Sequence, residues 1–152
     1  MKKIYVACSF AYEDKKKRDG VEEEIEKIVS YIEGAYPNLY NICVPHRYKV
    51  EHAWELPLEE WAKDVFEYDM KELEDSDIVL FISFGKENND GAAFEVGYAH
   101  SKKKQIIMIK MNDEVESAMI FPSADIILYK DEIKSYDWKN LPKHKSKLKR
   151  IS

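Results

Sequence analysis

The sequence of 152 residues contains few of the residue patterns that build disulfide frameworks, zinc sites or nucleotide-binding loops. Its two cysteines, Cys8 and Cys43, lie in apolar segments and belong to no CxxC pair or cysteine–histidine cluster, which predicts buried free thiols and no metal site. The segment "YVACSFAYED" at the end of the first apolar run contains none of the five glycines, so a GxGxxG dinucleotide-binding loop is disfavoured. P-loop, GxSxG and HExxH patterns are also missing.

Long hydrophobic runs are absent too. No apolar stretch approaches the roughly 20 residues that a membrane-spanning helix needs. The amino-terminal "MKKIYVACSF" meets charged residues after too short an apolar run for a signal peptide. A net charge of −5 gives no strong general attraction to nucleic acid. We therefore expect a cytoplasmic protein with neither a membrane segment nor a nucleic-acid partner.

Short apolar segments alternate with amphipathic ones along the chain, which has 45% hydrophobic residues. Strands are predicted at 3–10, 39–45, 77–84, 105–111 and 125–130, and helices within 14–37 and at 58–77 and 91–104, with a short helix or turn at 116–124. This alternation predicts one doubly wound α/β domain, flavodoxin- or Rossmann-like, with a five-stranded, mainly parallel sheet and helices on both faces. The domain is expected to span 1–138, followed by a basic tail at 139–152 that is solvated or frayed.

Two segments between the predicted strands have further features. The segment 45–57 has two prolines, two histidines and no period, so it is predicted to be a long loop with a binding role. The helix at 58–77 places a row of apolar residues on one face: Leu58, Trp61, Val65, Phe66, Met70 and Leu73.

Ligands of open parallel sheets bind outside the carboxyl ends of the strands. Three segments of this chain are expected to meet there. The first strand leads into Ser9 and Phe10, the third into the polar loop 85–90, and the fourth into "NDEVESAM".

An isolated acid within a small, apolar segment is the main chemical signal. In "NDGAAFEVGYAH" (89–100), Glu95 is the only charged residue after Asp90. It is interpreted either as a structural acid near a helix start or as a nucleophile or general base tuned by its surroundings. Asp69 offers a second carboxylate, and cleavage at an anomeric carbon uses two carboxylates with different tasks. Gly91 and its small neighbours would leave room for a substrate beside Glu95.

These segments resemble the nucleoside 2-deoxyribosyltransferases and the related nucleotide N-glycosidases. The resemblance rests on the order and spacing of "IYV" near the start, "YDMKELEDSDIVLF" and "DGAAFEVGYA", with "VPHRYK" and "IKSYDWKNLPK" as further segments. It implies that Glu95 attacks the anomeric carbon and forms a glycosyl ester, while Tyr5 holds Glu95 and Asp69 assists proton transfer to the base. No cofactor is implied.

The resemblance also implies where the substrate binds. Asn89 stands where the transferases place an Asp that reads the 5′-hydroxyl of the sugar, with Asp90 next to it. Arg47 stands where they carry a base-reading Gln. Ser117 and Met119 match a pair that is donated across a subunit interface, which implies a homo-oligomer, a dimer or an assembly of dimers, with shared active sites.

Three functions follow as hypotheses. The first is transfer of 2-deoxyribose between nucleobases, with deoxynucleosides and free bases as small-molecule partners. The second is hydrolysis of deoxynucleoside 5′-monophosphates, because Asn89 and Ser117 would repel a phosphate less than an Asp. The third is a non-enzymatic, nucleotide-binding flavodoxin-like module.

Overall fold

The computed structural model describes residues 1–9, 12, 14–86 and 89–142. Strands and helices alternate along these residues, as the apolar segments predict. The strands are β1 (Lys2–Ala7), β2 (Tyr40–Cys43), β3 (Ile78–Ser83), β4 (Gln105–Lys110) and β5 (Ile126–Tyr129), and the helices are α1 (Lys15–Ala35), α2 (Leu58–Glu74) and α3 (Asp90–Ser101). Short 3-10 helices are η1 (Pro45–Arg47), η2 (Ala53–Glu55), η3 (Phe121–Ser123) and η4 (Lys130–Glu132).

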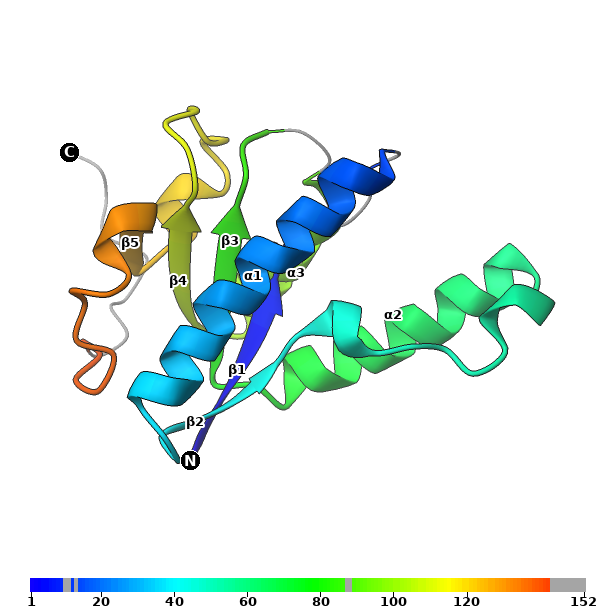
Figure 1. The fold of residues 1–152 in the computed structure, drawn as a ribbon, viewed down its shortest axis with the longest axis horizontal. Coiled ribbons are helices and arrows are strands. Elements are labelled where there is room, and N and C mark those ends of the chain that lie inside the picture. The colour runs from blue at the N-terminus through cyan, green and yellow to red at the C-terminus, as the bar shows by residue number, and fades with distance from the viewer. Residues whose placement is uncertain (10–11, 13, 87–88, 143–152) are drawn as a thin grey trace.

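The five strands form one sheet in the order β2-β1-β3-β4-β5, and every neighbouring pair is parallel. All the carboxyl ends of the strands therefore lie at the same edge of the sheet (Figure 1). The central strands β3 and β4 are buried along their whole length, because helices cover both faces. The predicted doubly wound α/β fold is confirmed, and the sheet is fully parallel.

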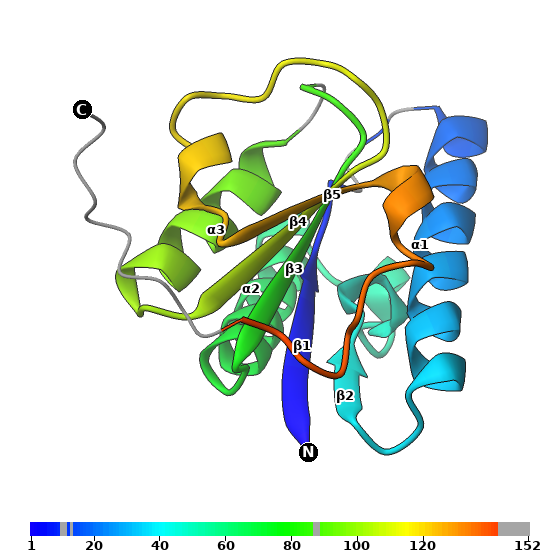
Figure 2. The ribbon, with the colours of Figure 1, turned by 90° about the vertical axis from the view of Figure 1, so that its left-hand side faces the viewer.

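Side chains that alternate along the strands build two separate cores. Ile4, Val6 and Leu80 point to one face, which α1 covers, whereas Tyr5, Val79 and Phe81 point to the other face, where α2 and α3 pack. Figure 2 shows α1 and α3 on opposite sides of the sheet. This separation decides which polar side chains can meet.

Helix α1 owes its position to a regular apolar stripe. The stripe is buried against the sheet and consists of Val21, Ile25, Ile28, Val29 and Ile32, as the helical spacing predicts. Asp14 caps the helix by accepting a hydrogen bond from the backbone N–H of Lys16 at 2.9 Å. Trp138 is buried in the same core, on the α1 face of the sheet.

Helix α2 also has an apolar face, but the sheet covers little of it. Only Leu73 is buried, whereas Leu58 is 76% exposed and Phe66 is 54% exposed. The amino-terminal part of α2 and the segment before it extend beyond the sheet (Figure 1). The helix was predicted correctly from its period, but the described residues leave most of its apolar face uncovered.

Element boundaries differ from the prediction mainly around the turns. The segment 116–124 is a turn followed by η3, and Pro122 lies within η3 instead of ending it. The predicted loop 45–57 contains η1 and η2. Cys8 is buried and Cys43 is half-buried, and both are free thiols as predicted. Among the described residues, no helix is both long and apolar enough to cross a membrane.

Candidate functional site

The carboxylate of Glu95 meets the hydroxyl of Tyr5 on the α3 face of the sheet. Tyr5 lies in the middle of β1 and is fully buried, and its hydroxyl donates a hydrogen bond to Oε2 of Glu95 in α3. The two residues are 90 positions apart in the sequence, so only the fold brings them together. A buried hydroxyl on a central strand is a rigid support, because the strand fixes its position and the core fixes its ring.

The environment of Glu95 favours its neutral form. The pKa of this carboxyl is raised to about 8, mainly by its removal from water; the hydrogen bond from Tyr5 opposes the rise, and the nearby charge of Asp69 adds to it. A structural carboxylate on the surface would have none of these features. A strongly shifted carboxyl beside a second acid is typical of a functional site.

Asp69 on α2 is the second acid of this pair. Its pKa is raised to about 6, mainly by burial and in part by the charge of Glu72 one turn along α2. Glu72 itself forms an ion pair with Lys3 at 2.6 Å, which lowers the pKa of Glu72. Asp69 and Glu95 therefore differ in acidity, with Asp69 the stronger acid of the two.

Burial and the two neighbouring acids raise the pKa of Tyr5 far above its ordinary value. The phenol thus remains protonated over the whole working range of pH. It can orient Glu95 as a hydrogen-bond donor, but it cannot itself act as a base.

Small residues of α3 have two different positions. Ala92 and Ala99 are buried against the sheet and allow the helix to approach it closely. Gly91 and Gly97 are exposed, and a Cβ atom added at either would meet nothing within 4 Å. The alanines therefore let this helix approach the sheet closely, whereas the open space beside Gly91 agrees with room for a ligand.

The loop after β3 is hydrogen-bonded to the loop after β4. Gly85 has a φ of +106°, and a Cβ there would lie 2.1 Å from a carboxylate oxygen of Glu114, so only glycine fits. The same carboxylate accepts the backbone N–H of Lys86 at 2.9 Å. Asn89 donates its side-chain amide to the carbonyl of Gly85, while Asp90 begins α3 and is exposed. These contacts position the segment that leads into α3, the helix that carries Glu95.

Other predicted site residues lie at the same carboxyl edge of the sheet. Ser9 follows β1 and is buried. Phe10 lies outside the described residues.

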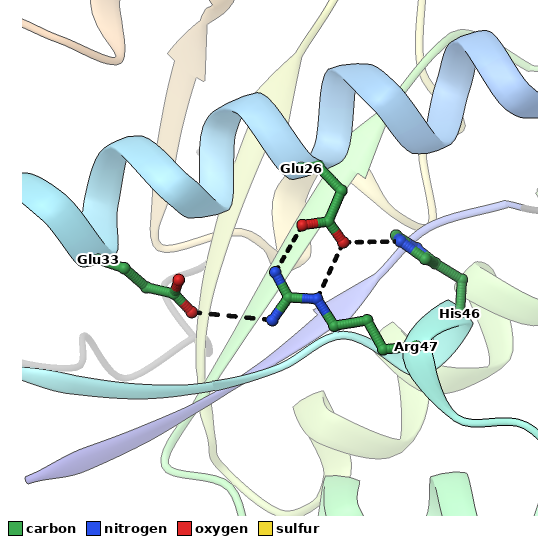
Figure 3. A network of polar contacts seen from close by, with 4 residues as sticks. All are labelled: Glu26, Glu33, His46 and Arg47. Carbon is green, nitrogen blue, oxygen red and sulfur yellow. Dashed lines mark hydrogen bonds and ion pairs between the residues drawn. The ribbon is translucent and has the colours of Figure 1, made fainter.

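Arg47 is engaged elsewhere in this structure. Its guanidinium binds Glu26 of α1 through two hydrogen bonds of 2.9 and 2.6 Å and lies 3.8 Å from Glu33 (Figure 3). His46 contacts the same Glu26 carboxylate at 2.9 Å. The bonds from Arg47 are the main reason why the pKa of Glu26 is lowered. The structure does not bring Arg47 into contact with Glu95 or Asp69.

Ser117 and Met119 lie on the far side of α3 from Glu95. They line a cavity of about 500 Å³ together with Ala93, Gly97 and His100 of α3. Ala93 and Gly97 are each two residues from Glu95, which is roughly 200° around the helix axis. Met119 is 86% exposed. Neither residue can reach the carboxylate of its own chain without crossing α3.

Two phenylalanines near the acids were not predicted as site residues, although Phe66 was placed on the apolar face of α2. Phe66 lies one turn before Asp69 on α2, and Phe94 precedes Glu95 on α3; their ring centroids are 6.2 Å apart. Both are exposed. Their position next to the two acids in the sequence was the signal that could have identified them. In the described part of the chain, no cluster of His, Cys, Asp or Glu has the geometry to hold a metal ion.

The sequence model of the nucleoside 2-deoxyribosyltransferase family matches residues 4–129. The chain belongs to this family. A nucleoside deoxyribosyltransferase of Lactobacillus johnsonii is 28% identical over 97 residues, which cover 62% of this chain and 64% of the relative. The chain thus matches somewhat less than two thirds of that protein.

Solved structures share the fold. A 2-deoxyribosyltransferase from Bacillus psychrosaccharolyticus superposes with a TM-score of 0.64 at 22% identity, over 90% of this chain and 93% of the other. A conserved protein from Enterococcus faecalis V583 superposes with a TM-score of 0.54 at 14% identity, over 89% of this chain and 85% of the other. At these identities the likeness concerns the architecture of the sheet and its helices.

Proposed function

We propose that this protein is a nucleoside 2-deoxyribosyltransferase in which Glu95 is the nucleophile. The observation that carries the proposal is the buried Tyr5–Glu95 hydrogen bond beside Asp69, in a chain that belongs to this family. The hydroxyl of Tyr5, which stays protonated, holds the carboxylate of Glu95, and Asp69 is a second acid beside it. Such a pair of carboxyls is suited to glycosidic bond cleavage.

In the first half-reaction, an oxygen of ionised Glu95 attacks C1′ of the deoxynucleoside. The bond between C1′ and the base nitrogen breaks, its electron pair stays on the base, and protonated Asp69 supplies a proton to the leaving base. In the second half-reaction, the N–H of an acceptor base gives its proton to Asp69, the nitrogen attacks C1′, and Glu95 is released as a carboxylate. Tyr5 orients Glu95 throughout.

The acidities of the two carboxyls determine how this division of roles is reached. With pKa values of about 8 and about 6, the pair holds one proton between them near neutral pH. Because Asp69 is the stronger acid, that proton lies mainly on Glu95 in the free protein, and the reactive form is the minor one, in which Glu95 is ionised and Asp69 carries the proton for the base. In the transition state the sugar develops positive charge next to Glu95. This charge stabilises the ionised form of Glu95 during the attack.

Hydrolysis of deoxynucleoside 5′-monophosphates is the second candidate. It is favoured by one observation, the neutral Asn89 at the edge of the site, whose amide binds the carbonyl of Gly85 and adds no negative charge. A dianionic phosphate is repelled less by an amide than by a carboxylate. Asp90, which is exposed at the start of α3, remains a candidate for reading the 5′ end.

We further propose that the active site is completed by a second subunit through Ser117 and Met119. Their exposure, and their place across α3 from Glu95, support a role in a neighbouring site. The uncovered apolar face of α2 supports the same assembly, because exposed apolar patches mark interfaces. Base recognition by Arg47 stays part of this proposal only if substrate binding releases it from Glu26 and Glu33.

The function is tested by trapping the ester. A 2-fluoro-2-deoxynucleoside slows hydrolysis of the ester, so intact-mass spectrometry is expected to find the fluorosugar on a peptide containing Glu95. Glu95→Gln should carry no adduct and should lose roughly three to five orders of magnitude in turnover, because it lacks the nucleophile. Turnover of the variant within tenfold of wild type would remove Glu95 from the mechanism.

The same assay separates the candidate reactions. Each deoxynucleoside and each monophosphate is incubated with and without a second base. A new nucleoside identifies the transferase, free sugar phosphate from the monophosphates alone identifies the hydrolase, and tight binding without base release would identify a non-enzymatic module.

Shared sites are tested by complementation. Glu95→Gln and Ser117→Trp are prepared separately, shown to be inactive, and mixed under conditions that exchange subunits. Ser117 is exposed, so the tryptophan leaves the fold intact. In a two-fold dimer a hybrid has one site with both lesions and one with neither, so activity should recover to about a quarter of wild type. A mixture that stays inactive after demonstrated exchange would show that each chain holds a complete site.

A further inference from the structure

A large cavity in the described part of the chain is remote from Glu95. It measures about 1020 Å³ and lies at the carboxyl ends of β4 and β5, between α1 and η4. Figure 2 shows η4 beside α1, across the sheet from α3. Its apolar wall includes Ile28 and Ile133, which belong to the α1-face core, whereas Tyr5 belongs to the core of the other face. A ligand here would not touch the carboxylate pair.

The chain after β5 explains why this space is open. An α-helix follows each of β1, β2 and β3. After β5 the chain forms only η4 and a segment that leads to the buried Trp138. No α-helix therefore packs beside α1 over β4 and β5 within residues 130–142. The gap lies at the carboxyl edge, where parallel sheets bind their ligands.

The lining of the cavity combines aromatic rings with ammonium groups. The ammonium of Lys110 lies 5.6 Å from the ring centroid of Tyr129, and that of Lys134 lies 5.9 Å from the ring of Tyr31. Lys110 ends β4 and is only 6% exposed. Among the described residues its ammonium has one hydrogen-bond acceptor, the carbonyl of Glu114 at 2.8 Å, although an ammonium can donate three.

The charge balance favours an anion near Lys110. Four lysines and three acids line the cavity, in a chain whose net charge is −5. One of the acids, Glu24, is already paired with Lys27 at 3.4 Å and Lys130 at 3.7 Å. A buried ammonium with spare donors is stabilised by an acceptor that carries charge.

We propose that this cavity is a second binding site, specific for a small anion that carries a planar aromatic ring, in the chemical class of nucleoside phosphates. The phosphate would contact the ammonium groups of Lys110, Lys130 and Lys134, and the ring would pack on Tyr31 or Tyr129. Small-molecule sites are typically roughly 300–1,000 Å³, so the cavity has room for such a ligand. The proposal is independent of the reaction at Glu95.

The test is calorimetric titration of the full chain with ADP, with adenosine and with inorganic phosphate. ADP should bind more tightly than either fragment, because it uses the rings and the lysines together. Lys130→Ala/Lys134→Ala should weaken ADP by at least about tenfold, since each charged hydrogen bond contributes that order of affinity. Both lysines are exposed, so this variant should fold; Lys110→Met is a second variant that removes the buried charge.

Two controls locate the binding. Lys63→Ala/Lys71→Ala removes two exposed lysines of α2 and should leave ADP affinity within about twofold, as should Asp69→Asn/Glu95→Gln. Equal losses in both lysine pairs would mean general charge attraction and would overturn the proposal. The proposal would also be overturned if only Asp69→Asn/Glu95→Gln lost ADP affinity, if no ADP binding were detected at millimolar concentration, or if adenosine bound as tightly as ADP.

Discussion

Helices α1 and α2 have similar amphipathic sequences but different environments. Helix α1 buries its apolar stripe against the sheet, whereas α2 buries only Leu73 and exposes Trp61 and Phe66. The difference arises from placement, because α1 lies along the sheet while much of α2 extends beyond it (Figure 1). The apolar face of α1 stabilises the domain itself. The face of α2 is available to a partner, on the same helix that carries Asp69.

The first prediction tests this difference between the helices with one side-chain truncation on each. Ile25→Ala on α1 should lower the free energy of unfolding by about 2–5 kcal/mol, because Ile25 is fully buried and truncation leaves a cavity. Phe66→Ala on α2 should cost about 1 kcal/mol or less, mainly its contact with Phe94. Urea unfolding of the two variants at high dilution measures both values.

The control is the concentration dependence of assembly, followed by sedimentation. Phe66→Ala should weaken self-association, while Ile25→Ala should leave the association of its folded fraction unchanged. If Phe66→Ala were as destabilising as Ile25→Ala in a monomeric sample, the apolar face of α2 would belong to the core of its own chain.

The second prediction compares two glutamates on opposite faces of the sheet. In the folded chain the pKa of Glu95 is about 8, above its ordinary 4.5. Between these values the folded chain retains a proton that the unfolded chain has released, so stability falls as pH rises. Glu95→Gln removes this cost and should stabilise the chain by about 1–3 kcal/mol at pH 8, with no gain below pH 4.5.

Glu26 on α1 provides the matched control with the opposite sign. Arg47 lowers its pKa, so ionised Glu26 stabilises the folded chain above pH 4.5, and this contribution is lost as the pH falls further. Glu26→Gln should therefore destabilise the chain at neutral pH and have a smaller effect in acid. Thermal unfolding across pH 4–8 measures both variants. A loss of stability in Glu95→Gln at pH 8 would contradict the interpretation of Glu95 as a strained functional acid.

The strand segments and α1 could be predicted from their residue patterns. Strands buried on both faces are apolar runs, and a helix buried on one side has an apolar stripe. The environment of α2 could not. A helical period reports which residues share a face, not what covers that face. Trp61 and Phe66 were correctly placed on one side, yet nothing in the local sequence distinguishes a core from an interface.

The carboxylate site was partly predictable for a related reason. The apolar segment around Glu95 indicated an unusual acid, and Asp69 was available as a second carboxylate. The family resemblance added Tyr5, and the structure brings both residues near Glu95. The partners of Arg47 were not predictable, because Glu26 is 21 residues away on another element and the pairing depends on how β2 and α1 meet. Local sequence carries no record of such contacts.

The last prediction concerns the dependence of turnover on pH. If one proton shared by Glu95 and Asp69 is required, kcat/KM should rise through about pH 6 and fall above about pH 8, changing about tenfold per unit outside these limits. Below the range both carboxyls are protonated and there is no nucleophile; above it neither can protonate the base. Asp69→Asn removes the proton donor, so its much lower activity should only rise with pH, as Glu95 ionises. A wild-type profile that rises without falling up to pH 9.5 would show that Asp69 does not supply the proton, and would leave Glu95 as the one titrating group that the reaction needs.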